Sequence, residues 1–236
     1  MSNWQQYEAQ QDVHDFKFET DARLGFIRKV YGILSVQLLV VAVFVLVGVL
    51  SSSFQEFIAE NFGIVLLAFL INVCTMIPLL CCKKVARKVP TNYILLAIFT
   101  ISESFIVACV CAFYDPTSVL IASIMTLSMT IALTVYAMTT KTDFSAMSGI
   151  MIVFLIAATM FAILMPFFFE SRMLQVIISS VFVIIYGIFL VIDTQLVIGS
   201  GKYSFDQDEY IIAAMSIYID IVGLFLYLLE LFGDNK

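Results

Sequence analysis

Charged residues and histidine are scarce in this chain of 236 residues. Asp, Glu, Lys and Arg make up 13% of it, against about 25% in an average soluble protein. The one histidine, His14, lies in the polar N-terminal segment. The apolar remainder therefore has no imidazole, which excludes a His-rich zinc site, Ser–His catalysis or a histidine proton relay there. We expect no catalytic residues and no enzymatic activity.

Apolar residues are correspondingly abundant. They make up 62% of the chain, and the mean hydropathy is +1.04. A soluble fold of this size could not hide so much apolar surface from water. The 12 Lys and Arg residues form no basic stripe, and the five cysteines lie within or at the ends of apolar runs. We therefore predict an integral membrane protein whose partner is the lipid bilayer, without nucleic-acid binding or a secreted disulfide framework.

Seven apolar runs reach the length of about 20 residues that a helix needs to cross a bilayer. None of them alternates in hydropathy as barrel strands do, so helices are the only structure that satisfies their backbone in lipid. The sequence predicts an all-α seven-transmembrane-helix bundle at 30–232, between a polar acidic tail at 1–29 and a short tail at 233–236. The spans are about 30–50, 62–82, 91–113, 117–139, 145–168, 174–198 and 210–232.

Basic residues are distributed unequally between the two ends of these spans. Ten of the 12 lie on the side of the N-terminal tail, and two, Arg172 and Lys236, lie on the other. Because Lys and Arg are retained in the cytosol, the N-terminus is predicted to be cytosolic. Seven crossings put the C-terminus on the far side, whereas a re-entrant last segment would return it to the cytosol. The ten are Lys17, Arg23, Arg28, Lys29, Lys83, Lys84, Arg87, Lys88, Lys141 and Lys202.

Three carboxyl groups lie deep in apolar sequence without a basic residue in any span. They belong to Glu103, Asp193 and Asp220. A charge at the bilayer centre costs at least a few kcal/mol, so these groups must hold a proton, coordinate a mobile cation, or hydrogen-bond to a neighbouring helix as structural polar contacts. Carboxylate oxygens are ligands that Ca²⁺ prefers.

The depths of the two aspartates allow them to meet. Counting about 1.5 Å per residue from the cytosolic ends of the last two spans puts Asp193 at roughly 7 Å and Asp220 at roughly 15 Å, and uncertain boundaries shift each value by about 5 Å. Two carboxyl groups in contact cannot both ionise cheaply, so such a pair would share one proton. Asp193 and Asp220 are therefore the predicted pH-sensing and transient Ca²⁺-binding residues, and Glu103 is a predicted pore-lining residue.

Four segments resemble the Bax inhibitor/Lifeguard family, and its Lifeguard branch in particular. They are FIRKVYGILSVQLLV at 26–40, FTISES around Glu103, YGIFLVIDTQLVIG ending at Gly199, and DEYIIAAMSIYIDIVGLFLYLLELF ending at Phe232. The resemblance implies a seven-helix bundle whose last helix is central. It also implies that Asp193 and Asp220 form a di-aspartyl unit gating a pH-sensitive calcium leak that regulates calcium stores and suppresses apoptosis. Some members carry a basic residue in the second span, where this chain offers only Asn72 and Thr75.

The resemblance also sets expectations for partners and place. No cofactor is expected to be permanently bound, Ca²⁺ and H⁺ are the expected ions, and cell-death regulatory membrane proteins are expected partners. The Golgi or endoplasmic reticulum membrane is expected, with plasma membrane and endolysosome as alternatives. A non-conducting regulator of cell-death or stress signalling is the alternative function. An intramembrane aspartyl protease also pairs aspartates from two spans, but Ile192 precedes Asp193 and no Pro-Ala-Leu segment occurs.

Overall fold

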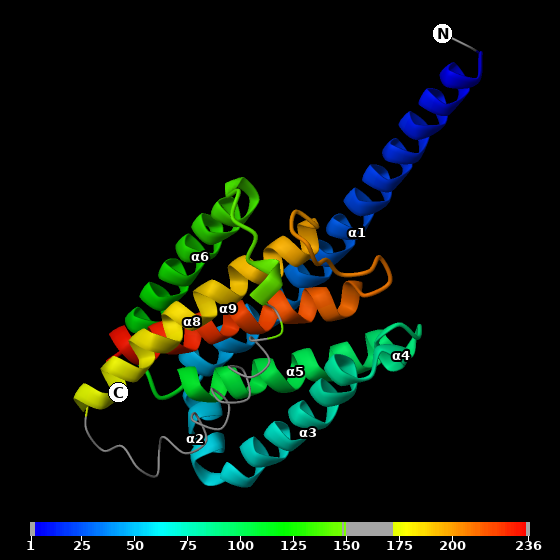
Figure 1. Cartoon of the computed structure of the whole chain (residues 1–236). Helices are drawn as coiled ribbons and strands as arrows, with labels where there is room; N and C mark the ends of the chain where they lie inside the picture. Colours follow the sequence, from blue (N-terminus) through cyan, green and yellow to red (C-terminus); the bar gives the residue numbers. More distant parts are fainter. Residues whose placement is uncertain (1–2, 148, 150–171, 235–236) are drawn as a thin grey trace.

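The computed structural model describes residues 3–147, 149 and 172–234, with side chains from residue 18 onward. This part of the chain is a bundle of helices without strands, and one end of the first helix projects beyond it (Figure 1). Six helices are long and apolar enough to cross a membrane. The elements are α1 (Asn3–Leu50), α2 (Ser52–Glu60), α3 (Phe62–Cys81), α4 (Lys83–Ala86), α5 (Thr91–Cys111), α6 (Pro116–Thr139), the 3₁₀ turn η1 (Ser145–Met147), α8 (Arg172–Ile198) and α9 (Tyr210–Phe232).

The long helices lie where the apolar runs predict them. Five of them, α3, α5, α6, α8 and α9, begin and end within two residues of the predicted spans. The sixth, α1, ends at Leu50 as predicted, but it begins at Asn3, so the N-terminal segment continues the first span as one helix. The fifth predicted span, 145–168, lies outside the described residues apart from η1 and Gly149, so a seventh helix stays a prediction.

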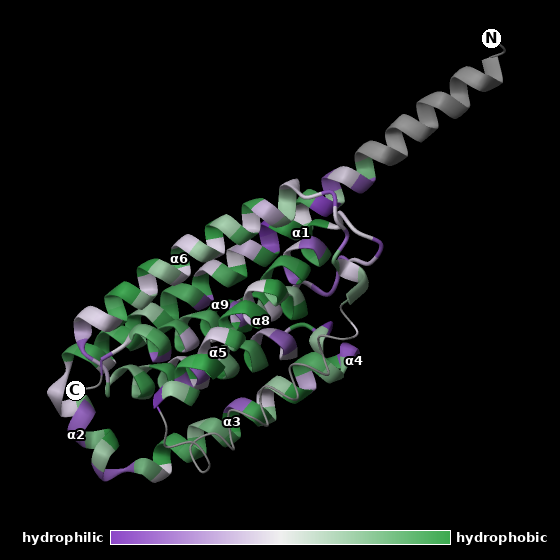
Figure 2. Ribbon diagram, turned by 60° about the vertical axis from the view of Figure 1, so that its left-hand side comes forward, coloured by the Kyte–Doolittle hydropathy of each residue, from purple (hydrophilic) through white to green (hydrophobic). Residues whose placement is uncertain are grey.

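Helix α9 lies at the centre of the bundle. Of its most apolar stretch 78% is buried, whereas the corresponding value is between 17% and 50% for the other five long helices. It is packed against α8, α1, α6 and α5. Apolar residues line the length of the helices and polar residues gather at their ends, as expected for a chain that crosses a bilayer (Figure 2).

Contacts at its two ends show that α9 crosses the whole bundle. Tyr210, its first residue, lies against Lys29 of α1 and Tyr93 of α5. Beyond its last turn, the carbonyl of Asp234 accepts a hydrogen bond of 3.0 Å from the backbone N–H of Asp115, which caps α6. Helix α9 therefore runs from one end of the bundle to the other. We call the side with Lys29, α4 and residues 199–209 the basic end, and the other side the Asp115 end.

The two residues that flank the undescribed segment lie at opposite ends. The Ser145 hydroxyl accepts a hydrogen bond of 3.1 Å from the N–H of Tyr203, at the basic end. Arg172, which begins α8, interacts electrostatically with Tyr114 at the Asp115 end. Because α8 then returns to the basic end at Ile198, α6 and α8 run in the same direction, both toward the basic end.

Candidate functional site

Asp193 of α8 and Asp220 of α9 face each other inside the bundle. Their residues are 7% and 4% exposed, and their carboxyl groups lie within hydrogen-bonding reach of each other. No N–H or O–H group of the described residues donates to Oδ2 of Asp220. A buried carboxylate oxygen without a donor is costly, so the pair needs a proton, a water molecule or a cation.

Antiparallel packing of α8 on α9 brings the aspartates together. Toward the Asp115 end, the ring of Tyr186 lies 5.7 Å from that of Tyr227, and Phe182 is stacked on Tyr227 at 4.7 Å. Gly223 is what lets the helices approach, because a Cβ atom there would overlap the Tyr186 ring. A residue one turn from Asp220 must therefore be small for the carboxyl groups to meet.

Glu103 of α5 belongs to the same polar interior. Its carboxyl group interacts with the side-chain amide of Asn72 on α3. It is also close enough to Tyr186 and Tyr218 to act on their hydroxyl groups electrostatically, as Asp220 is on Tyr186. Glu103 and Asp220 thus approach Tyr186 from different helices, and the structure places Glu103 inside the bundle.

No cation among the described residues balances these acids. The interactions that reach the three carboxyl groups come from Asn72 and from the aspartates themselves, not from Lys, Arg or His. The buried Tyr218 hydroxyl lies near Ser104 of α5, also a neutral group. No group of three or more His, Cys, Asp or Glu side chains arranged for a metal ion occurs among residues 18–147 and 172–234. Two aspartates supply too few oxygens for a resident Ca²⁺, which takes 6–8, but they suit an ion in passage.

Arg23 fixes the end of α8 beyond Asp193. Its guanidinium donates to the carbonyls of Leu196 at 2.6 Å, Phe205 at 2.8 Å and Ile198 at 3.2 Å. Gly199, at a φ of +74°, ends the helix and leaves room for that side chain. A cation on the final carbonyls of a helix is favourable for both hydrogen bonding and the helix dipole. From the sequence alone, Arg23 is only one of the basic residues that indicate topology, and its bonds to the end of α8 are not predicted.

A second set of cations holds the start of α9. Lys83 Nζ lies 2.7 Å from Glu209 Oε1, and Arg87 bonds to the same oxygen at 2.9 Å. Arg87 also pairs with Asp206 at 2.7 Å and with Asp208 at 3.1 Å. Burial alone would raise the pKa of Glu209, but the bonds from Lys83, the Asp206 N–H and Arg87 lower the pKa below its ordinary value. In the sequence, an acidic run at 206–209 and a basic run at 83–88 lie at the same ends of their spans, and this pattern could have predicted the ionic cluster.

The loop after α6 is fixed to the same end of the bundle. Gln195 of α8 accepts from the N–H of Phe144 at 2.8 Å and donates to the carbonyl of Thr142 at 3.0 Å. Asp143 accepts from the Ser145 hydroxyl at 2.6 Å and from the N–H of Lys202 at 2.8 Å. These bonds, that of Ser145 first, lower the pKa of Asp143. Two residues after Asp193, α8 is thus tied to the loop after α6, and Asp143 ties that loop to the one between α8 and α9.

Comparison with known proteins identifies the family. A family described as "Inhibitor of apoptosis-promoting Bax1" matches residues 23–236, almost the whole chain. The chain belongs to this Bax inhibitor family. It is 32% identical over 218 residues to protein lifeguard 3 of Homo sapiens, covering 91% of this chain and 70% of the human protein. It is 31% identical over 217 residues to protein lifeguard 3 of Mus musculus (90% and 70%), and 35% identical over 222 residues to a BI1-like protein of Arabidopsis thaliana (92% and 84%).

Family membership confirms the resemblance drawn from the four segments. The second span, here α3, has Asn72 and Thr75 as its polar residues and no basic residue. Asn72 is 6% exposed, donates to the Ser102 hydroxyl at 3.5 Å and reaches Glu103. Thr75 instead donates to carbonyls of its own helix at 2.9 Å. In this member, α3 therefore offers α5 a neutral amide and brings no positive charge to the aspartates.

Proposed function

We propose that this chain is a pH-sensitive calcium leak channel of an intracellular membrane, gated by the Asp193–Asp220 pair. The observation that carries the proposal is a buried pair of carboxyl groups that, within the described part of the chain, has one oxygen without a donor and no cation in reach. Membership of a family described as inhibitors of apoptosis-promoting Bax1 supports a membrane role against apoptosis. Regulation of calcium stores would connect the ion flux to that role.

The gate works through the charge of the pair. With one proton shared, a hydrogen bond joins α8 to α9, and a single negative charge is left. Once that proton is lost, two like charges in a region of low dielectric must separate or be bridged by a cation. Protonation therefore sets helix separation and Ca²⁺ occupancy together. Such an element has two states: protons favour the joined pair, and Ca²⁺ favours the deprotonated, separated pair.

The constraints around the pair direct the motion. Arg23 and Gln195 fix α8 at the basic end, and the ionic cluster at Glu209 fixes the start of α9 there. The Gly223–Tyr186 contact lies on the other side of the aspartates, where no ion pair joins the two helices among the described residues. Separation of the carboxyl groups should therefore be accommodated toward the Asp115 end, around Tyr186 and Tyr227.

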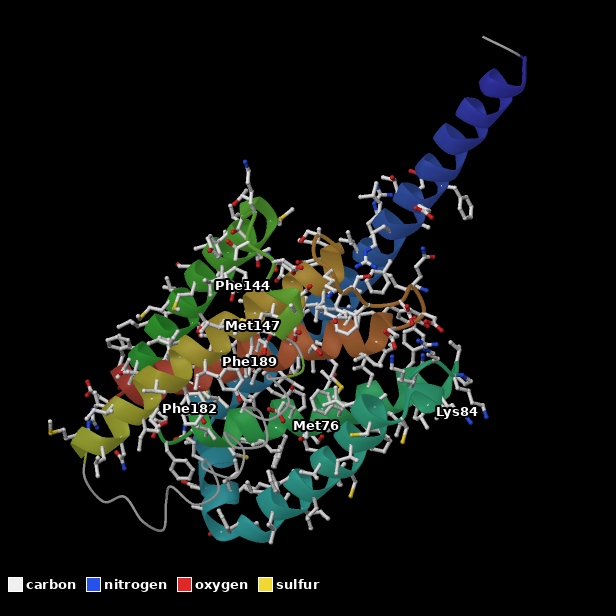
Figure 3. The ribbon with its side chains drawn as sticks, in the orientation of Figure 1. Met76, Lys84, Phe144, Met147, Phe182 and Phe189 are labelled. Carbon is white, nitrogen blue, oxygen red and sulfur yellow. The ribbon has the colours of Figure 1, made fainter. Side chains whose placement is uncertain are left out.

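We propose that the basic end faces the cytosol, in a Golgi or endoplasmic reticulum membrane, and that the protein acts without catalysis. The ten-to-two distribution of Lys and Arg supports this orientation. Lys84 lies on α4 at the edge of the bundle, where it is exposed (Figure 3). In a chain whose cysteines are replaced, Lys84→Cys should react with an impermeant maleimide from the cytosolic side only. Labelling from the lumen alone would reverse the orientation.

Purified protein in calcium-loaded liposomes tests the proposal directly. The wild-type chain should release Ca²⁺ in the absence of any other protein, at a rate that changes with pH. Asp193→Asn/Asp220→Asn protein, reconstituted at the same density, should keep its fold and lose the pH response. No release by the wild-type chain at any pH would refute the channel. It would leave the non-conducting regulator of cell-death signalling, which acts through protein partners, as the function to pursue.

A further inference from the structure

A groove of about 530 Å³ runs along the outside of the bundle between α1 and α5, away from the aspartates. Its lining includes Lys29, Gly32 and Gln37 from α1, and Tyr93, Ala97 and Thr100 from α5. Gly32 and Ala97 make it hollow, because neither helix has a large side chain at these positions. A Cβ atom added to Gly32 would meet nothing within 4 Å. The groove thus results from small residues that face each other across two helices.

The two helices run parallel here, so the groove has a defined direction. Lys29 and Tyr93 both contact the Tyr210 ring, at the basic end. Two turns further along both helices, Gln37 Nε2 donates to Thr100 Oγ1 at 3.0 Å and closes the floor of the groove. From Lys29 to Val40 the α1 wall has a length of roughly 16 Å at about 1.5 Å per residue. One leaflet of a bilayer with a hydrocarbon core of about 30 Å has nearly the same depth.

The side walls face lipid and the one charge is at the mouth. Val36 and Ile101, which line the groove, are 63% and 54% exposed, so the groove opens to the outside of the bundle. Lys29 Nζ lies 3.9 Å from the centroid of the Tyr210 ring. It forms no ion pair with a described Asp or Glu, whereas Lys83 and Arg87 at the same end do. Its positive charge is therefore available to a ligand from the membrane.

We propose that this groove binds an anionic phospholipid of the leaflet at the basic end. One acyl chain would lie between Gly32 and Ala97, and the head-group phosphate would contact Lys29 with the Tyr93 hydroxyl beside it. A chain one leaflet long matches the length of the groove, and the unpaired ammonium at its mouth selects a negative head group. A zwitterionic lipid could fill the same hollow, but it would gain less from Lys29.

Native mass spectrometry of the detergent-purified chain tests the site. Phosphatidylserine and phosphatidylcholine with identical acyl chains serve as probes, and inorganic phosphate serves as the competitor without a chain. The wild-type chain should retain phosphatidylserine preferentially, and millimolar phosphate should not displace it. Lys29→Gln should weaken the binding of phosphatidylserine about five-fold, which is the effect of one basic residue at a membrane surface. It should leave the binding of phosphatidylcholine unchanged. Lys84→Gln, an exposed cation away from the groove, is the matched control.

A second variant separates the groove from its charge. Gly32→Leu places a side chain in the hollow without a backbone clash and should reduce retention of both lipids; Ala97→Leu does the same from α5 if the first variant is not monodisperse. Equal retention of the two lipids by the wild-type chain, or an unchanged preference in Lys29→Gln, would refute the role of Lys29. Displacement by phosphate alone would identify a simple anion site. Wild-type retention in the two leucine variants would refute the groove.

Discussion

Replacing Asp193 and Asp220 by Asn, singly and together, is the most direct test of whether the two residues act as one unit. Asn keeps the size of the side chain and can donate a hydrogen bond, so the α8–α9 contact should survive. What each substitution removes is one titratable group, and with it the doubly charged state of the pair. Both single variants should therefore conduct Ca²⁺ at a rate that no longer depends on pH.

The size of the expected effect follows from the contact between the two carboxyl groups. Two unit charges about 4 Å apart repel each other by about 4 kcal/mol at an effective dielectric constant of about 20. An energy of that size changes the population of a state by about a thousand-fold. Because no Lys, Arg or His reaches the pair among the described residues, no neighbouring charge offsets the repulsion. The pair can therefore drive a transition between two helix arrangements.

The assay is Ca²⁺ release from liposomes between about pH 5 and pH 8, analysed as a double-mutant cycle. If the two groups share one proton, the double variant should be no more impaired than either single variant, because the first substitution already abolishes the coupled state. Asp115→Asn, which changes an aspartate at the end of the bundle, should behave like the wild-type chain. Effects of the two substitutions that add would show independent sites and refute the shared-proton gate.

Two further predictions concern stability. Glu209→Gln should lower the free energy of unfolding by about 1 kcal/mol, because the buried Glu209 side chain loses its charge-assisted bonds to the solvent-accessible Lys83 and Arg87. Asp208→Asn, at an exposed neighbour, should cost little. Because folding lowers the pKa of Glu209, its contribution to stability is complete above about pH 4.3 and is lost as the pH falls through the folded pKa. The melting temperature of Glu209→Gln should therefore lack the part of the decrease at acid pH that Glu209 causes in the wild-type chain. Gly223→Ala should destabilise the chain by about 1–3 kcal/mol, because the added methyl group overlaps the Tyr186 ring. Gly32→Ala, where the methyl group meets nothing within 4 Å, should be neutral or stabilising. Equal melting temperatures for the two variants would show that α9 relaxes around the methyl group at residue 223.

The sequence predicts the helices well because the bilayer constrains them strongly. A run of about 20 apolar residues has no other structure in lipid, so the span limits follow from composition and five of the helices agree with them within two residues. The approach of Asp193 to Asp220 follows from connectivity, since consecutive helices joined by a short loop pack antiparallel. The central position of α9 does not follow from composition, because its hydropathy of 2.2 is below that of four of the five less buried long helices.

The sequence fails where polar groups at the ends of helices choose partners far along the chain. Arg23 reaches carbonyls more than 170 residues away, and Arg87 reaches carboxylates about 120 residues away. A Lys or Arg at the end of a span can act as a topology signal, and it can also bind a carbonyl or carboxylate of another segment. Hydropathy does not distinguish these two roles. The groove at Gly32 cannot be predicted from the sequence for the same reason, because its second wall comes from α5, another helix.

Glu103 provides the test of how far the polar interior extends beyond the aspartates. It shares Tyr186 with Asp220 but contacts Asn72 on a different helix, so it lies at one edge of the acidic centre. Glu103→Gln keeps the shape and the hydrogen bond to Asn72 and removes only the charge, so stability should change by less than about 1 kcal/mol. If Glu103 lines the ion path, Ca²⁺ flux should fall and its pH dependence should shift, while Glu56→Gln on the exposed face of α2 changes neither. Unchanged flux in a fully folded Glu103→Gln protein would assign this carboxyl group to helix packing and restrict the gate to the aspartate pair.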